Sequence, residues 1–248
     1  MFTHHGKERT FKHNLQIASL LSFVAGIVNV AGFLSVAKLT TNITGHFAFF
    51  IDEAFKLDIL QTFLYSIYIL AFFLGSFTSG FLIEVLSRKS ARFVYVIPII
   101  IETCLLTAIS FLDKNFITHH ENVVATMLLY AMGIQNSLVT KISNATVRTT
   151  HLTGLFTDLG IELSQLFFYK EKEQRTTLFR SINLRFIIIS FFFLGGLLSG
   201  ILYDLFQIKV LLLGSVTLIA GVIYSFKDHY PTSPATLIIK KGEKKEIK

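Results

Sequence analysis

Residues 26–47 read GIVNVAGFLSVAKLTTNITGHF, and residues 133–156 read GIQNSLVTKISNATVRTTHLTGLF. Both stretches contain Gly-Ile-x-Asn followed by Thr-Thr-x-x-Thr-Gly-x-Phe. A third block, Leu-Gly followed by Ser-Gly, occurs at residues 74–80 and again at residues 194–200. One such block can match by chance, but three blocks in the same order indicate an internal repeat. The repeated units cover about residues 14–113 and 121–226.

The composition places this repeat in a membrane. Of the 248 residues, 52% are hydrophobic and only 16% are charged, with 26 Phe and a mean hydropathy of +0.60. A soluble domain carries roughly 25% charged residues on its surface, so this chain has too little polar material to face water on all sides. The single cysteine, Cys104, excludes an internal disulfide and a Cys/His metal cluster, and we expect no metal or cofactor. The sequence therefore predicts an all-α polytopic membrane protein.

The apolar residues fall into six stretches that approach the length of about 20 residues needed for a transmembrane helix. They are Leu15–Val36, Ile59–Leu86, Phe93–Leu112, Val123–Ile142, Phe186–Phe206 and Val210–Phe226. Two further stretches, Thr40–Phe55 and Thr149–Tyr169, are semi-apolar, are interrupted by Thr-Gly and contain acids. These two are short spans or re-entrant segments.

The basic residues predict the orientation. With six spans, 19 Lys and Arg lie on the side of both termini and four lie on the opposite side. Eight spans would move Arg88, Lys89 and Arg92 to that opposite side, so the positive-inside rule favours six spans with both termini cytoplasmic. Residues 1–226 then form one transmembrane domain, and residues 227–248 form a basic cytoplasmic tail. In such a protein the net charge of +7 indicates topology and contact of the basic loops and tail with anionic lipid, not nucleic acid.

Each half holds three spans, which is an odd number, so the second half is predicted to lie inverted relative to the first. The two Thr-Gly segments then enter the membrane from opposite sides. Inverted repeats whose broken helices meet near the bilayer midplane are a common plan of secondary transporters.

The Thr-Gly segments supply the candidate substrate-binding residues. Thr hydroxyls and free backbone N–H groups at the positive end of a helix dipole can bind a polar solute. The candidates are Asn29, Thr41, Thr44, Gly45, His46, Asn136, Thr150, His151, Thr153 and Gly154. Alternatively, the small residues permit close helix packing, the two Asn hydrogen-bond the broken segments, and the histidines are ordinary polar residues at helix ends.

Three acids are candidates for proton coupling. Glu102 lies near the middle of the third span, and an ionisable residue at that depth is a functional candidate. Asp158 and Glu162 lie one helical turn apart, directly after the second Thr-Gly pair. The first half has Phe49 and Glu53 at the corresponding positions, so the two halves differ chemically. The alternative is that Arg148 or another basic side chain pairs with Asp158 or Glu162 in a structural ion pair.

Two stretches resemble the signatures of a known family. Residues 26–34 with Thr41–Gly45 resemble the first signature of the YoaK-like family of bacterial membrane proteins, and Arg148–Glu162 is similar to its second, more specific one. The resemblance covers about residues 14–226, and His46 stands where that family often has Asn. The family is a domain of unknown function. The resemblance therefore implies a bacterial inner-membrane protein and supplies no substrate.

These patterns predict a secondary transporter or permease for a small polar or anionic solute, which works by alternating access between the two halves. One alternative is an intramembrane enzyme that uses Glu102, Asp158 and His151, but the sequence contains no recognised nucleophile–base or metal-binding pattern, so we expect no enzyme. The other alternative is a non-transporting scaffold or sensor that presents its basic tail to partners.

Overall fold

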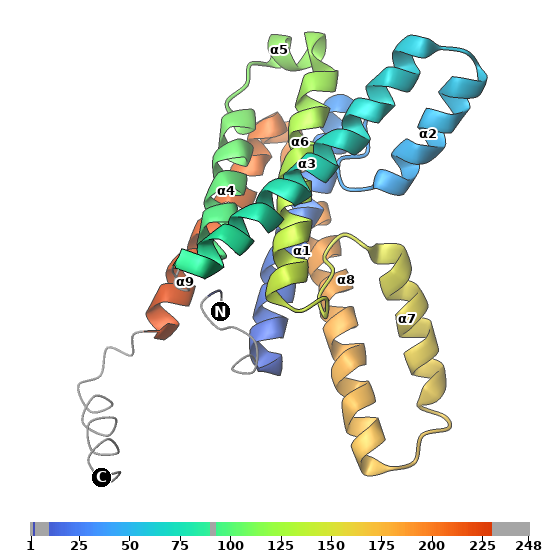
Figure 1. Ribbon diagram of the computed structural model, residues 1–248, viewed down its shortest axis with the longest axis vertical. Coiled ribbons are helices and arrows are strands. Elements are labelled where there is room, and N and C mark those ends of the chain that lie inside the picture. The colour runs from blue at the N-terminus through green and yellow to red at the C-terminus, as the bar shows by residue number, and fades with distance from the viewer. Residues whose placement is uncertain (1, 3–9, 90–92, 230–248) are drawn as a thin grey trace.

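The computed structural model describes residue 2, residues 10–89 and residues 93–229, so most of the predicted tail lies outside the described residues. The regular elements of the described chain are all helices (Figure 1). They are α1 (Phe11–Val36), α2 (Ile43–Phe55), α3 (Ile59–Lys89), α4 (Val96–Ser110), α5 (Lys114–His119), α6 (Glu121–Ile142), α7 (Leu152–Gln165), α8 (Lys172–Phe206), the 3₁₀ helix η2 (Gln207–Val210) and α9 (Leu211–His229).

The long helices coincide with the apolar stretches. Within the described ranges, four stretches are both long and apolar enough to cross a membrane. They are Phe11–Val36, Ile59–Arg88, Glu121–Ile142 and Lys172–Phe226, of which the last comprises α8, η2 and α9. The apolar helix α4 is shorter, at 15 residues. Together these helices make the chain a polytopic membrane protein.

Helix α8 begins earlier than its apolar run predicts. The apolar residues start near Phe186, but the helix starts at Lys172 and has 35 residues. At 1.5 Å per residue it is about 52 Å long, whereas the hydrocarbon core of a bilayer is about 30 Å thick. The polar first part of α8 therefore projects beyond the apolar part, and residues 172–185, which precede the predicted fifth span, are helical.

Two pairs of long helices cross with their backbones almost in contact. Helix α1 packs along α8, and a Cβ atom on Gly26 would lie only 2.0 Å from the carbonyl oxygen of Phe192. In the same crossing, a Cβ on Gly195 would lie 2.1 Å from the carbonyl oxygen of Phe23. Both positions therefore require glycine.

The crossing of α3 with α6 has the same construction. A Cβ on Gly75 would lie 2.1 Å from the carbonyl oxygen of Tyr130, and one on Gly133 would lie 2.2 Å from that of Phe72. These four residues are the counterparts, under the sequence repeat, of the four residues at the other crossing. Helices α4 and α9 pack against each other, and they also pack against α6 and α1 respectively.

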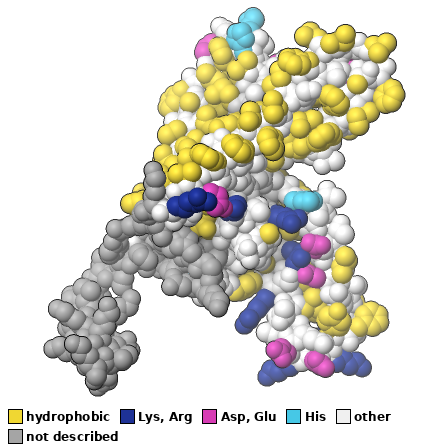
Figure 2. All heavy atoms as spheres, viewed as in Figure 1, with side chains coloured by type: hydrophobic (Ala, Val, Ile, Leu, Met, Phe, Trp, Pro, Cys, Tyr) yellow, Lys and Arg dark blue, Asp and Glu magenta, His cyan; other side chains and the backbone are white. Residues whose placement is uncertain are grey.

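Two helical hairpins project from this bundle toward opposite ends (Figure 1). We call residues 43–65 the first arm and residues 152–185 the second arm. Among the described helices, α2 contacts α3 alone and α7 contacts α8 alone. Apolar side chains cover the first arm, whereas charged side chains gather on the second arm (Figure 2).

Candidate functional site

Each Thr-Gly segment is tied to the long helix that precedes it. The hydroxyl of Thr41 donates to Oδ1 of Asn29 at 2.7 Å, and the hydroxyl of Thr150 donates to Oδ1 of Asn136 at 2.7 Å. The amide of Asn136 in turn donates to the carbonyl oxygen of Met132 at 2.9 Å. The two asparagines thus hydrogen-bond the broken segments, as one of the two sequence-based interpretations predicts.

The starts of α2 and α7 differ in their caps. Asn42 caps α2, because its Oδ1 accepts a hydrogen bond from the backbone N–H of Gly45 at 3.2 Å. At the corresponding position of α7, His151 makes no side-chain capping hydrogen bond. Its ring instead covers Gly154, where a Cβ would lie 2.9 Å from the ring Cδ2 atom. The first turn of α7 therefore keeps backbone N–H groups that no side chain caps.

The remaining candidates of the two segments lie in different environments. Thr44 and Thr153 are exposed, and so is His151. In contrast, the His46 side chain is only 1% exposed, and its Nε2 lies 2.6 Å from the carbonyl oxygen of Leu39. The rings of Tyr65 and Tyr68 pack against the His46 ring at centroid distances of 5.9 and 5.1 Å. His46 is therefore enclosed by two tyrosine rings of α3 and by the backbone at Leu39.

A single arginine joins the two acids of α7. Arg185 of α8 lies 2.7 Å from Oε1 of Glu162 and 3.2 Å from Oδ2 of Asp158, and it also donates to the hydroxyl of Ser181. This arrangement agrees with the ion-pair interpretation of the two acids. We call Asp158, Glu162 and Arg185 the Arg185 clasp.

Sequence reasoning missed the part that Arg185 plays, although the repeat contains a signal for it. The repeat matches Asp158 with Phe49 at a displacement of 109 residues. Beyond the insertion at Lys170–Thr177 the displacement is 120 residues, and it matches Arg185 with Tyr65. In the first arm the rings of Phe49 and Tyr65 stack at a centroid distance of 5.3 Å. The same two positions therefore hold each arm together, with an aromatic stack in the first arm and an ion pair in the second.

A polar cavity of about 200 Å³ lies beside the Arg185 clasp, and Asp158 and Arg185 form part of its wall. Two residues of the turn that leads into α7, Asn144 and Ala145, adopt left-handed backbone conformations with φ of 51° and 60°. The cavity is lined by Ala145, Thr146, Arg148, His151, Gly154, Leu155, Asp158 and Arg185. It thus brings three predicted residues together with two arginines at the start of α7.

Glu102 lies elsewhere in the bundle. Its side chain in α4 is fully buried, and neither carboxyl oxygen has a hydrogen-bond partner among the described residues. Helix α4 contacts neither α2 nor α7. The structure therefore does not bring Glu102 together with the Thr-Gly segments.

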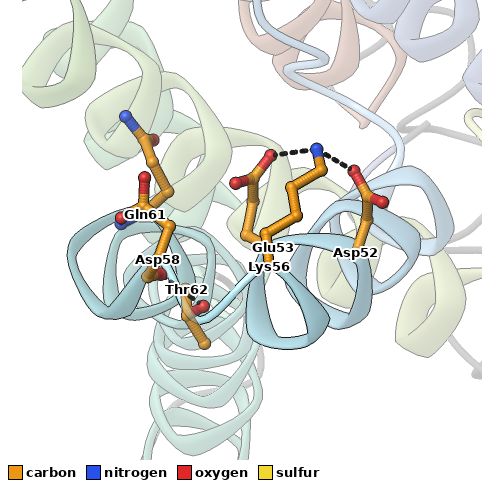
Figure 3. A network of polar contacts seen from close by, with 6 residues as sticks. All are labelled: Asp52, Glu53, Lys56, Asp58, Gln61 and Thr62. Atoms are coloured by element: carbon orange, nitrogen blue, oxygen red, sulfur yellow. Dashed lines mark hydrogen bonds and ion pairs between the residues drawn. The ribbon is translucent and has the colours of Figure 1, made fainter.

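The tip of the first arm carries an acidic network (Figure 3). The ammonium of Lys56 lies 2.6 Å from Asp52 and 3.1 Å from Glu53. These hydrogen bonds, first that to Asp52 and then that to Glu53, raise the pKa of Lys56 above its usual value. Asp58 accepts a hydrogen bond from the backbone N–H of Gln61 at 3.0 Å at the start of α3. Three acids and one lysine thus lie at this tip.

Comparisons with known proteins find one family model and one named relative that the chain is similar to. The family model described as "Protein of unknown function (DUF1275)" matches residues 17–224. The chain is also 24% identical to "UPF0700 transmembrane protein YoaK" of Bacillus subtilis (strain 168) over an aligned region of 195 residues. This region covers 75% of this chain and 82% of that relative. No solved structure matches.

Proposed function

Since the chain belongs to the DUF1275 family of proteins of unknown function, we propose its activity from its own residues: it is a secondary transporter. It moves a small polar or anionic solute across the bacterial inner membrane by alternating access between two halves. Both termini are cytoplasmic, because that orientation keeps most of the basic residues on the cytoplasmic side.

In this function the chain crosses the membrane six times, by α1, α3, α4, α6, α8 and α9, as two inverted halves. The observation that carries the proposal is the matched packing of the long helices. The contact of Gly26 with Phe192 has its counterpart in that of Gly133 with Phe72, with each helix replaced by its equivalent from the other half. Such an exchange is what a two-fold relation between the halves requires.

The charges at the tips of the arms support the inversion. The first tip holds Asp52, Glu53 and Asp58 with one basic residue, Lys56. The second tip, at residues 170–175, holds three basic residues and two acids. Basic residues concentrate on the cytoplasmic side of inner-membrane proteins, so tips of opposite charge fit opposite sides of the bilayer.

The arms supply the moving parts. Each arm helix that starts at a Thr-Gly segment contacts a single partner helix, so its movement leaves the two crossings of the long helices in place. The two helix starts present Thr hydroxyls and N–H groups at positive dipole ends, which suit a polar or anionic solute. Movement of α2 and α7 in alternation opens the site to one side and then to the other.

Glu102 is the proton-coupling residue in this scheme. Its carboxyl is buried and has no cation partner among the described residues, whereas Asp158 and Glu162 share Arg185. A carboxyl that is buried without a cation favours its neutral, protonated form and loses its proton when water reaches it. Asp158 and Glu162 instead hold α7 against α8.

The inversion can be tested by accessibility labelling. We would place single cysteines at Asp58 and at Lys170 in a Cys104→Ser background and label intact cells with a membrane-impermeant maleimide. The proposal expects Asp58→Cys to react from outside, and Lys170→Cys to react only after the membrane is opened. Labelling of both positions from the same side would refute the inverted arrangement. Uptake into proteoliposomes across a panel of small solutes tests transport itself.

A further inference from the structure

We propose that the cavity at the start of α7 binds a small oxyanion, such as a carboxylate, phosphate or sulfate group, which takes the place of Asp158 on Arg185. This inference rests on the proposed transport function and names the solute class that the second half recognises. It is carried by the unpaired guanidinium of Arg148 in the lining, by the unequal ion pairs of the Arg185 clasp, and by the size of the cavity.

Two guanidinium groups line the cavity, and one of them, that of Arg148, has no carboxylate partner among the described residues. Arg148 and Arg185 line it together with His151, and Asp158 is the one acid in the lining. Arg148 is exposed and forms no ion pair with the described residues. Guanidinium groups bind planar or tetrahedral oxyanions through paired N–H donors. The lining therefore has an excess of donors that an anion can satisfy.

The two ion pairs of Arg185 are unequal. Glu162 lies closer, at 2.7 Å, and its side chain is 14% exposed. Asp158 lies at 3.2 Å and is 52% exposed. An arriving anion can displace Asp158 into water at little cost in solvation, while Glu162 keeps Arg185 in place. The exchange replaces one anion–guanidinium contact by another and requires no new buried charge.

The cavity has room for a small anion. A volume of about 200 Å³ corresponds to roughly six or seven water molecules at about 30 Å³ each. Phosphate, sulfate and carboxylates of three or four carbon atoms fit this space.

The first half lacks these features, which makes the site specific to the second half. The repeat matches Arg148 with Leu39 and His151 with Asn42. Asn42 already accepts the hydrogen bond of the Gly45 N–H, whereas the first turn of α7 has no side-chain cap. A solute that binds symmetrically to both halves is therefore not expected.

The test uses the full-length protein in nanodiscs of zwitterionic lipid. Binding of sodium phosphate, sodium sulfate and sodium lactate would be titrated calorimetrically at constant ionic strength, with glycerol as the uncharged control. We expect saturable binding of at least one anion. Arg148→Gln should weaken that binding at least tenfold, and Asp158→Asn should strengthen it several-fold because the competing carboxylate is gone. Arg175→Gln is the matched control, because it removes an exposed arginine of the second arm that does not line the cavity.

Several outcomes would overturn the inference: no saturable binding of any of the three anions, equal weakening by Arg175→Gln and Arg148→Gln, or no gain with Asp158→Asn. Proteoliposome uptake separates this inference from the transport proposal. If the protein binds an anion but no solute is taken up, the transport proposal is refuted and the anion site is retained. If Arg148→Gln and Asp158→Asn do not change uptake, the anion site is refuted and the transport proposal is retained.

Discussion

Replacing Gly75 by alanine should destabilise the protein strongly, because the crossing of α3 with α6 has no room for a methyl group. The added Cβ would lie 2.1 Å from the carbonyl oxygen of Tyr130, 2.9 Å from its carbonyl carbon and 3.2 Å from the backbone nitrogen of Ile134. All three atoms belong to the backbone of α6, so no side-chain rotation relieves the clash. The two helices must separate by about 1 Å or more along their contact.

The expected cost is at the upper end of the range for overpacking. Added methyl groups in packed cores cost about 1–3 kcal/mol when side chains can adjust. Here the backbone must move, so we expect a loss of about 3 kcal/mol in the free energy of unfolding. Gly80→Ala on the same helix is the control. Its Cβ would lie 3.5 Å from the hydroxyl oxygen of Ser137, which is an ordinary contact, so we expect a change of less than about 1 kcal/mol.

The assay is reversible unfolding of the purified protein in mixed micelles of mild detergent and SDS, followed by circular dichroism. Gly26→Ala, at the other crossing, should lose about as much stability as Gly75→Ala, because its Cβ would lie 2.0 Å from the carbonyl oxygen of Phe192. Stability of Gly75→Ala within about 0.5 kcal/mol of the wild type would refute the close approach of the two backbones.

Three further predictions concern side chains of the arms and the bundle. Arg185→Gln leaves Glu162, which is 14% exposed, without its cation, so it should cost about 2 kcal/mol in the same unfolding assay; an unchanged midpoint would mean that the clasp contributes nothing. Thr41→Val removes the hydrogen bond to an asparagine amide oxygen and should cost about 1 kcal/mol, whereas Thr44→Val, at an exposed position, should be near neutral; equal losses would contradict the assigned contact. Glu102→Gln should leave the fold intact and abolish the pH dependence of uptake in proteoliposomes, and wild-type pH dependence would exclude Glu102 from proton coupling.

The sequence predicts the helices better than their contacts. Hydropathy and length are local properties, so the apolar stretches agree with α1, α3, α4, α6 and the apolar part of α8 and α9. Hydropathy reports contact with lipid and not helix formation, and it therefore missed the polar first part of α8 from Lys172. The intrinsic helix propensity of Lys, Glu, Gln and Arg in this segment carries that information instead.

The candidate site could be predicted only in part. A hydrogen bond between Asn29 and the broken segment is one of the two interpretations that the sequence leaves open, and the structure identifies Thr41 as its partner. The partner of Asp158 lies on the following helix, 27 residues away, and composition alone does not choose Arg185 among the basic residues of the second half. The burial of His46 depends on rings from the next helix, which no local pattern reveals.

The pairing of the long helices has a consequence for the order in which the protein is made. Helix α1 is synthesised first, yet its main packing partner is α8, which ends at Phe206. The main packing partner of α3 is α6, which is likewise synthesised later. The glycine face of α1 must therefore remain without its partner in the bilayer until α8 has been inserted. In a chain truncated before α8, helix α1 would lack its main packing partner. Such a chain would expose the glycine face of α1 to membrane quality-control proteases.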